Sequence, residues 1–372
     1  MKEIIISIRN IFFKLIYKGF LKPVFFFLDP EAVHDAMIRL GRVLGSSSFS
    51  RKLTTFFLSY SNKKLEQNIL GIKFNNPIGL AAGFDKDGLL TNILPSVGFG
   101  FAEIGSITGE PCKGNPRPRL WRLKKSKGLV VYYGLMNRGC VEISNRLKNE
   151  NFIIPIGTNV AKTNNKKTVV TTEGIKDYLK AYSQFSNVGN YFTINISCPN
   201  AYGGQPFTSS EKLDKLLTEI DKIPTEKPIF VKLSPDLSKE QIDKIIDICS
   251  EHRVNGFICS NVTEERSNNK IFDKNVPKKG GISGKPVEDL ANDLISYVYQ
   301  KTKGRSVIIG CGGVFSAKDA YKKIKLGACL VQLFTGMIFE GPQVISEINQ
   351  GLVKLLRKDG FKNISQAVGS AN

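Results

Sequence analysis

Acidic residues are scarce in this chain of 372 residues, which holds 53 Lys and Arg against 33 Asp and Glu. The formal net charge of +20 favours anionic partners, such as nucleic acid, an acidic membrane surface or an anionic small molecule. No RNA-binding aromatic motif, zinc-ligand spacing or helix-turn-helix pattern stands out. We therefore expect no nucleic-acid partner, and a solvated lysine-rich surface is the simpler explanation of much of the charge.

Paired cysteines and long apolar runs are also lacking. The cysteines number 7, include no Cys-x-x-Cys pair and mostly stand in apolar segments, so we expect neither a disulfide framework nor a metal site. No apolar run approaches the ~20 residues of a membrane-spanning helix, and no secretory cleavage site is evident. The 41% hydrophobic content and 34 glycines are typical of a globular α/β protein.

The first 28 residues form an apolar, aromatic-rich segment that basic residues interrupt at Arg9, Lys14, Lys18 and Lys22. This pattern favours a basic amphipathic helix that lies in a membrane interface. The alternative is a helix that packs on the main domain and never touches lipid.

A second helix is predicted after Asp29–Pro30, because apolar residues recur at helical spacing in "PEAVHDAMIRLGRVL". We divide the chain into amphipathic N-terminal helices over residues 1–45, a connector over residues 46–70 and a large domain over residues 71–372.

Eight short apolar runs alternate with helix-like segments in the large domain. Alternation of this kind predicts a parallel sheet, and eight units in about 290 residues predict a (β/α)₈ barrel. An open doubly wound sheet is the competitor, but it usually has fewer units and an early G-x-G-x-x-G, which is absent. The runs are 77–83, 101–108, 153–160, 191–197, 228–234, 256–261, 306–313 and 329–336, and the expected helices are 87–97, 139–149, 173–188, 211–222, 238–252, 286–303, 316–326 and 342–357.

The carboxyl ends of the predicted strands carry small and polar residues, which is where barrels place their chemistry. Gly312–Gly313 and Thr335–Gly336 stand at the last two ends, a common phosphate site. Lys86 and Lys232 also fall at strand ends, and an enclosed lysine needs an anionic partner. Flavin mononucleotide (FMN) would supply one. Alternatively, the glycines only satisfy tight turns.

Several motifs resemble those of dihydroorotate dehydrogenases, and the N-terminal extension resembles that of the membrane-associated, quinone-reducing class. The similarity runs from about Phe25 to the C-terminus. The motifs are "LDPEAVH" (28–34), "NPIGLAAGFDKDG" (76–88), "GNPRPRLWRL" (114–123), "INISCPN" (194–200), "VKLSPDLS" (231–238), "GGISGKP" (280–286), "IIGCGGV" (308–314) and "ACLVQLFTG" (328–336).

The resemblance implies an FMN-containing barrel that oxidises (S)-dihydroorotate to orotate in pyrimidine synthesis, with quinone as the electron acceptor. It implies that the substrate contacts Lys86, Asn195, Asn200 and Asn261. The residues expected to hold FMN are Ala81, Ala82, Gly83, Ser106, Asn159, Asn195, Lys232, Ser260, Gly284, Gly313, Phe334 and Thr335. Ser260 and Phe334 stand where Thr and Tyr are more usual.

Cys198 occupies the place of the catalytic base, which removes a proton while the flavin takes a hydride. A thiol suits this role if nearby cations lower its pKa. The membrane class normally has Ser here, and Cys is typical of the soluble classes. The alternative is an inert buried thiol.

The substrate loop departs from the family pattern as well. An ungapped comparison puts Val131 and Tyr132 where Asn and Arg are usual, and "GLMNRG" (134–139) is closer to the soluble classes. A shifted register would restore Asn-Arg at Asn137–Arg138. A lost amide would weaken orotate ~10- to 100-fold, unless Asn137 reaches in to compensate. The alternative function is therefore oxidation or reduction of another dihydropyrimidine or an enone-type compound.

His34 and Arg122 fall where the membrane class binds its quinone, and both side chains suit hydrogen bonds to quinone carbonyls. We expect the protein to sit peripherally on the cytoplasmic face of the cell membrane. A packed, non-functional His34 is the simpler alternative, and a non-enzymatic membrane scaffold is the third hypothesis for the whole chain.

Overall fold

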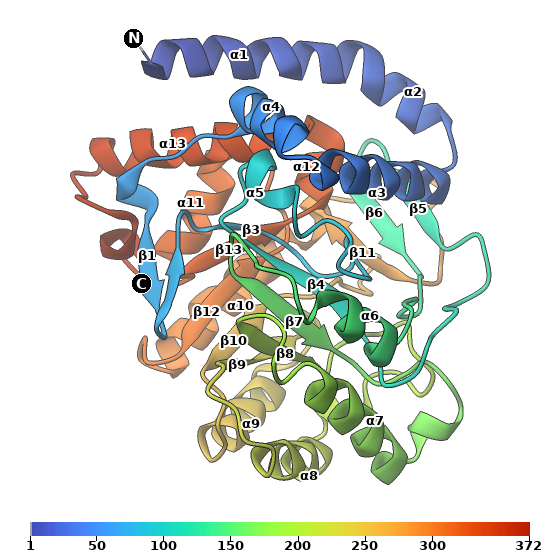
Figure 1. Cartoon of the computed structure of the whole chain (residues 1–372). Coiled ribbons are helices and arrows are strands. Elements are labelled where there is room, and N and C mark those ends of the chain that lie inside the picture. Colours follow the sequence, from blue (N-terminus) through green and yellow to red (C-terminus); the bar gives the residue numbers. More distant parts are fainter. Residues whose placement is uncertain (1) are drawn as a thin grey trace.

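A closed parallel barrel forms the centre of the computed structural model, which describes residues 2–372 (Figure 1). Each of the apolar runs predicted as a strand contains one barrel strand, so the (β/α)₈ fold is confirmed. Around the barrel the strands follow the order β10-β12-β13-β3-β4-β7-β8-β9. Their bounds are β3 Ile78–Leu80, β4 Phe101–Ile107, β7 Ile156–Val160, β8 Tyr191–Asn195, β9 Ile229–Leu233, β10 Gly256–Cys259, β12 Val307–Cys311 and β13 Leu330–Leu333.

The barrel interior changes from apolar to polar along its axis. At the amino end, a hairpin of β1 (Gln67–Ile69) and β2 (Ile72–Phe74) closes the barrel, where Phe74 and Phe101 pack edge to face at 5.5 Å. Farther along, the buried Glu103 carboxylate accepts hydrogen bonds from Asn159 at 2.7 Å and Thr193 at 3.0 Å. These donors satisfy a carboxylate that has no cation within ion-pair distance in the described chain.

The predicted outer helices are present with shifted ends, with one exception. The prediction of a helix over residues 87–97 is mostly wrong. Only Leu94–Val97 (α5) is helical there, because Gly88 adopts a positive φ of 67° and the Asp85 carboxylate accepts the N–H groups of Leu89 and Leu90. The other helices are α6 Cys140–Leu147, α7 Thr171–Gln184, α8 Ser210–Asp221, α9 Lys239–Ser250, α10 Glu288–Lys301, α11 Ala317–Lys325, α12 Thr335–Glu340 and α13 Val344–Lys358.

An antiparallel sheet that the sequence pattern did not predict joins two distant loops. It consists of β5 (Leu120–Leu123), β6 (Gly128–Val131) and β11 (Gly281–Gly284). The pairing of Gly281 with Val131 brings residues 150 positions apart together and fixes the backbone of the substrate loop.

The N-terminal extension is helical almost throughout. Helix α1 (Lys2–Ile16), a π-helical segment (Tyr17–Leu21) and α2 (Lys22–Phe27) precede α3 (Pro30–Ser46). Asp29 caps α3 by accepting the Ala32 N–H at 2.8 Å. The segment 46–70, expected as a connector, instead holds helix α4 (Ser48–Leu58), which Ser47 caps. The division of the chain at residues 45 and 70 stays a prediction.

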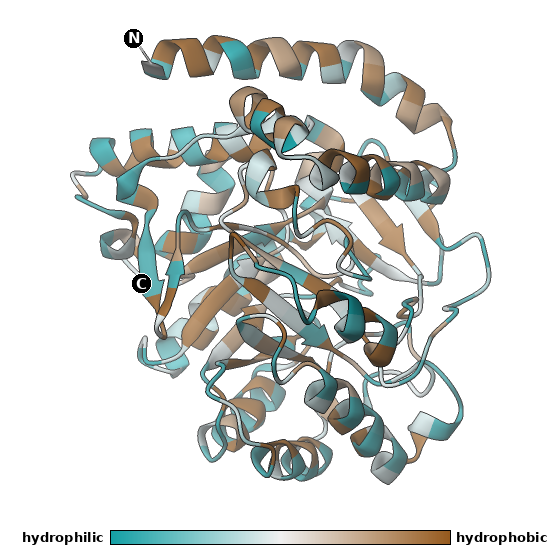
Figure 2. Ribbon diagram, in the orientation of Figure 1, coloured by the Kyte–Doolittle hydropathy of each residue, from teal (hydrophilic) through white to brown (hydrophobic). Residues whose placement is uncertain are grey.

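Helix α1 contacts α13 and runs above it in Figure 1. Its inner side makes polar contacts, such as that of Lys14 to Glu347 at 3.0 Å. In the π-helical segment that follows, the Tyr17 hydroxyl donates to the Ile338 carbonyl at 2.7 Å. The outer side of α1 exposes large apolar side chains, as the brown segments of the helix indicate (Figure 2). None of the helices in residues 2–372 has the length and apolarity needed to cross a bilayer.

Candidate active site

A cavity of about 410 Å³ runs from the mouth of the barrel to the N-terminal helices. One end is polar, because it is lined by the loops that follow the barrel strands. The other end is apolar and is lined by side chains of α2, α3 and α4, such as Phe26, Met37 and Leu58. The two ends belong to one continuous space, so two ligands of different polarity can lie near each other.

Most of the sequence-predicted residues line this cavity. They are Ala81, Ala82, Gly83, Lys86, Ser106, Asn195, Cys198, Asn200, Lys232, Ser260, Asn261, Gly284, Gly313, Phe334 and Thr335, together with His34 and Arg122.

Two predicted residues lie outside the cavity lining. The Asn137 amide donates to the Thr108 hydroxyl and to the Leu135 carbonyl, both at 2.8 Å, and accepts the Gly139 N–H. Asn137 therefore shapes the loop, and the structure does not bring it to the cavity as a substitute for the missing amide. Asn159 bridges Glu103 and Ser106 behind the cavity wall.

The asparagines at the polar end are held in fixed orientations by neighbouring polar groups. Asn195 donates to the Ser106 hydroxyl at 2.9 Å, and Asn261 donates to the carbonyl and hydroxyl of Ser197, each at 2.9 Å. Asn200 donates to the Val131 carbonyl at 2.9 Å. Preoriented amides of this kind suit a ligand with alternating donors and acceptors.

Cys198 stands just after β8, at the border between the strand and its loop. Burial raises the pKa of its thiol to about 11, against the opposing influence of Lys162 and Lys232. The thiol is therefore almost fully protonated near neutral pH in the ligand-free protein. A base at this position needs nearby cations to hold a thiolate.

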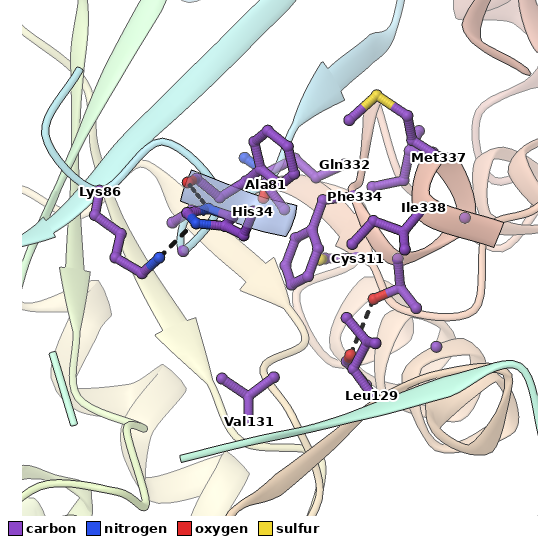
Figure 3. Close-up of a pocket in the computed structure, with 18 of the residues that line it drawn as sticks. His34, Ala81, Lys86, Leu129, Val131, Cys311, Gln332, Phe334, Met337 and Ile338 are labelled. Carbon is purple, nitrogen blue, oxygen red and sulfur yellow. Dashed lines mark hydrogen bonds between the residues drawn. The ribbon is translucent and has the colours of Figure 1, made fainter. Parts of the chain in front are cut away.

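Lys86 lies where the two ends of the cavity meet. Its ammonium nitrogen is 3.9 Å from the Tyr133 ring centre and 3.4 Å from His34 Nε2 (Figure 3). Burial lowers the Lys86 pKa to about 8. No carboxylate of residues 2–372 lies within ion-pair distance of it, so an anionic ligand would find an available cation here.

His34 projects from α3 toward the barrel. Its Nε2 donates to the Phe84 carbonyl at 2.8 Å, and burial together with the Lys86 ammonium lowers its pKa. Arg122 donates to the Leu28 carbonyl at 2.8 Å and stacks on Phe26 at 4.9 Å. Both residues border the apolar end of the cavity.

The two residues that the ungapped comparison places in the substrate loop differ in position, and the register itself stays a prediction. Val131 lines the cavity, whereas Tyr132 does not and instead packs its ring beneath Lys279 at 5.0 Å. An apolar side chain therefore occupies a wall position where the family pattern has an amide.

Sequence reasoning missed several cavity residues. Tyr133 is 7% exposed, and its hydroxyl has no hydrogen-bond partner in the described chain. Gln332 donates to Glu103 at 3.0 Å, while its Oε1 is buried without a partner. Outside the cavity lining, the missed Glu31 pairs with Arg119 at 2.7 Å and anchors α3. Glu31 and Gln332 stand inside the quoted motifs 28–34 and 328–336, which was the only sequence signal for them, and Tyr133 stands outside the motifs.

The polar end fits a flat anionic cofactor. Lys232 is 4% exposed and has no carboxylate partner within residues 2–372. At Gly83, whose φ is 101°, an added Cβ would meet nothing within 4 Å, so the backbone there borders open space. In the described part of the chain, no group of three or more His, Cys, Asp and Glu residues is arranged to hold a metal ion.

A (β/α)₈ barrel with its cavity at the carboxyl ends of the strands and a helical extension over that cavity defines a barrel enzyme with two adjoining ligand sites. The family model "Dihydroorotate dehydrogenase" matches residues 64–356. The chain belongs to the dihydroorotate dehydrogenase family.

The relatives that match are of similar length. A protein of Trichodesmium erythraeum named "Dihydroorotate dehydrogenase (quinone)" is 36% identical over 386 residues, covering 98% of each chain. One of Rippkaea orientalis with the same name is 40% identical, covering 83% of this chain and 84% of the relative. The crystal structure of DHODH from Eimeria tenella in complex with ferulenol has a TM-score of 0.82 and 28% identity, covering 92% of this chain and 95% of that one.

Proposed function

We propose that this protein oxidises (S)-dihydroorotate to orotate in pyrimidine synthesis, with bound FMN and with quinone as the electron acceptor. The single observation that carries this proposal is the continuous cavity with a polar, lysine-bearing end and an apolar end beneath the N-terminal helices. The quinone-reducing relatives named above support the choice of acceptor.

FMN, when bound, supplies an acceptor for the hydride that leaves the substrate. The residues that would hold FMN are those that the family resemblance implies, namely Ala81, Ala82, Gly83, Ser106, Asn159, Asn195, Lys232, Ser260, Gly284, Gly313, Phe334 and Thr335. Lys232 would supply a cation for the cofactor, and the unpartnered Gln332 Oε1 would accept a hydrogen bond from the N–H of the flavin ring. Asn159 would act by holding Ser106.

Substrate binding would use the cation of Lys86 for the carboxylate and the amides of Asn195, Asn200 and Asn261 for the ring. The Asn200 side-chain N–H already donates to the Val131 carbonyl. The side-chain oxygen of Asn200 therefore stays available to accept a ring N–H of the substrate. Cys198 would remove the proton from the carbon next to the one that loses the hydride. The proton ends on the sulfur, and the ring gains its double bond.

Quinone would enter at the apolar end. His34 and Arg122 border this end, and each would donate a hydrogen bond to one of the two carbonyl oxygens, for which the His34 N–H would leave the Phe84 carbonyl. The enclosing side chains of α2 and α3 exclude water, which favours an apolar head group over an aqueous acceptor.

Peripheral contact with a membrane surface, on the cytoplasmic face of the cell membrane, is part of this proposal. It is supported by the exposed apolar side chains beside the apolar end of the cavity, which are interleaved with the exposed Arg39, Arg42 and Lys52. The apolar side chains are Ile4, Ile8, Ile11, Phe12, Leu15, Phe20, Val24, Phe27, Leu40, Val43, Phe49, Leu53 and Phe56.

A second candidate rests on Val131, which leaves one wall position without an amide. Under this alternative the protein keeps FMN but acts on another dihydropyrimidine or an enone-type compound.

The test is reduction of the flavin in detergent-purified protein. Dihydroorotate added without oxygen should bleach the flavin absorbance, and a soluble quinone should restore it. A flavin that stays oxidised with dihydroorotate but is bleached by another dihydropyrimidine would favour the second candidate. A bleached flavin that quinone fails to reoxidise would reject the acceptor.

A further inference from the structure

Lys162 is a buried cation to which no role has been assigned. It follows β7, is 3% exposed and has no carboxylate within ion-pair distance in residues 2–372. Its ammonium donates to one neutral acceptor, the Tyr202 carbonyl, at 2.6 Å. Burial of an ammonium group with a single neutral partner is unfavourable, so a compensating anion nearby would stabilise it.

Lys162 and Cys198 line the same small cavity, which has a volume of about 10 Å³. This is close to the space of one water molecule. Cys198 also lines the large cavity, whereas Lys162 does not. The cysteine therefore stands between the substrate side and a second, smaller cavity that carries the lysine.

Lys162 also fixes the loop that carries Cys198. Tyr202, which accepts its hydrogen bond, lies four residues after the cysteine, and the Tyr202 N–H is bound in turn by Asn164. The loop is attached on its other side by Asn115, which donates to the Asn200 carbonyl at 3.0 Å. The segment with Lys162 and Asn164 and the segment with Asn115 therefore both hold the loop in place by hydrogen bonds to its backbone.

The charged and titratable groups around the thiol come from several elements. Lys162 after β7 and Lys232 in β9 both lower the Cys198 pKa, and Cys112 opposes them weakly. Asp177, a carboxylate that acts to raise the Lys162 pKa against the larger opposing effect of burial, already accepts the N–H groups of Thr163 at 2.7 Å and Gly109 at 3.2 Å. In the proposed function Lys232 faces the cofactor, which leaves Lys162 as the cation that lines the small cavity.

We propose that Lys162 is a positioning residue for the reaction, whose ammonium holds the loop through Tyr202 and stabilises the thiolate of Cys198. The inference rests on the proposed function, because it takes Cys198 as the base. In the form that accepts the substrate proton, a minor fraction near neutral pH, Cys198 is a thiolate and Lys162 is an ammonium lining the same small cavity. When the substrate proton moves to sulfur, the thiol becomes neutral and the lysine keeps its charge.

The experiment uses the flavin-loaded protein and three variants at residues 162 and 166, and only the alkylation step is run without substrate. Lys162→Gln keeps a hydrogen-bond donor for Tyr202 but removes the charge, and Lys162→Arg keeps both. Lys166→Gln is the matched control, because Lys166 is exposed on the same loop. Thermal melting of each variant reports whether the fold is retained.

The first readout is the rate of iodoacetamide alkylation at Cys198 between pH 6 and 10, followed by mass spectrometry of the peptide that contains it. Loss of the charge raises the thiol pKa, so Lys162→Gln should slow alkylation by roughly three- to tenfold at a fixed pH. Lys162→Arg and Lys166→Gln should match the unaltered protein within about twofold. The second readout is the pH profile of flavin reduction by dihydroorotate, whose rising limb should move to higher pH only in Lys162→Gln.

Unchanged alkylation and an unchanged pH profile in Lys162→Gln would overturn the proposal. So would an equal loss in both readouts for Lys162→Arg, because a retained charge should rescue the thiolate. If Cys198→Ala still reduces flavin at the full rate, the assignment of the base fails, while the alkylation data continue to report on the lysine separately.

Discussion

The cation at Lys86 makes substrate binding sensitive to pH. Burial places the Lys86 pKa at about 8, and the carboxylate of orotate should bind only the protonated amine. In the free protein about a tenth of the amine is neutral at pH 7 and about nine tenths at pH 9. The dissociation constant of orotate should therefore rise by about tenfold between these two pH values, with most of the rise above pH 8.

Replacing Lys86 with Met tests the same reasoning. The variant loses one charge-assisted hydrogen bond, which contributes about 1.5–3 kcal/mol, so orotate should bind about 10- to 100-fold more weakly at pH 7. Its dissociation constant should then be nearly flat from pH 7 to 9. Lys86→Arg is the control, because it stays charged over the whole range and should also bind without a pH dependence in this window.

The assay is titration of the flavin absorbance with orotate, which needs no turnover. A dissociation constant for the unaltered protein that stays within about twofold from pH 7 to 9 would refute the assigned pKa. Binding by Lys86→Met as tight as by the unaltered protein would refute the carboxylate contact itself.

Three further outcomes are expected. Val131→Asn should tighten orotate binding about tenfold in the same titration, because it restores an amide to the cavity wall, and unchanged binding would favour the second candidate substrate. Glu31→Ala should lower the free energy of unfolding by about 3–5 kcal/mol in urea denaturation, because it leaves Arg119 buried without its carboxylate; a loss below 1 kcal/mol would contradict this. His34→Ala should raise the KM for quinone severalfold in steady-state assays while leaving flavin reduction by dihydroorotate unchanged, and an effect on both half-reactions would place His34 in the substrate site instead.

Local patterns were sufficient for the barrel strands. Each is a short, β-branched or apolar run followed by Gly, Ser or Asn, and such a run is buried whichever neighbour it pairs with. The region 87–97 shows where pattern fails. It contains Leu89, Leu90, Ile93 and Leu94 at near-helical spacing, yet the Asp85 side chain and the positive φ of Gly88 impose turns that hydropathy does not reveal.

The antiparallel sheet and α4 were missed for a different reason. β6 and β11 are four residues each, and their pairing depends on a partner 150 positions away. The segment with α4 is rich in Ser and Lys, so its composition resembles that of a connector. Packing on α3 and α5 overrides this composition.

By itself the sequence determined the repeating strand–helix order, the polar strand ends and the family motifs, because these depend on residue type and spacing along the chain. Only the tertiary structure decided which side chains meet. It turned Asn137 into the loop, put Val131 on the cavity wall and brought His34 to Lys86, since these contacts join residues from separate elements. Long-range packing sets them, and no local pattern carries that information.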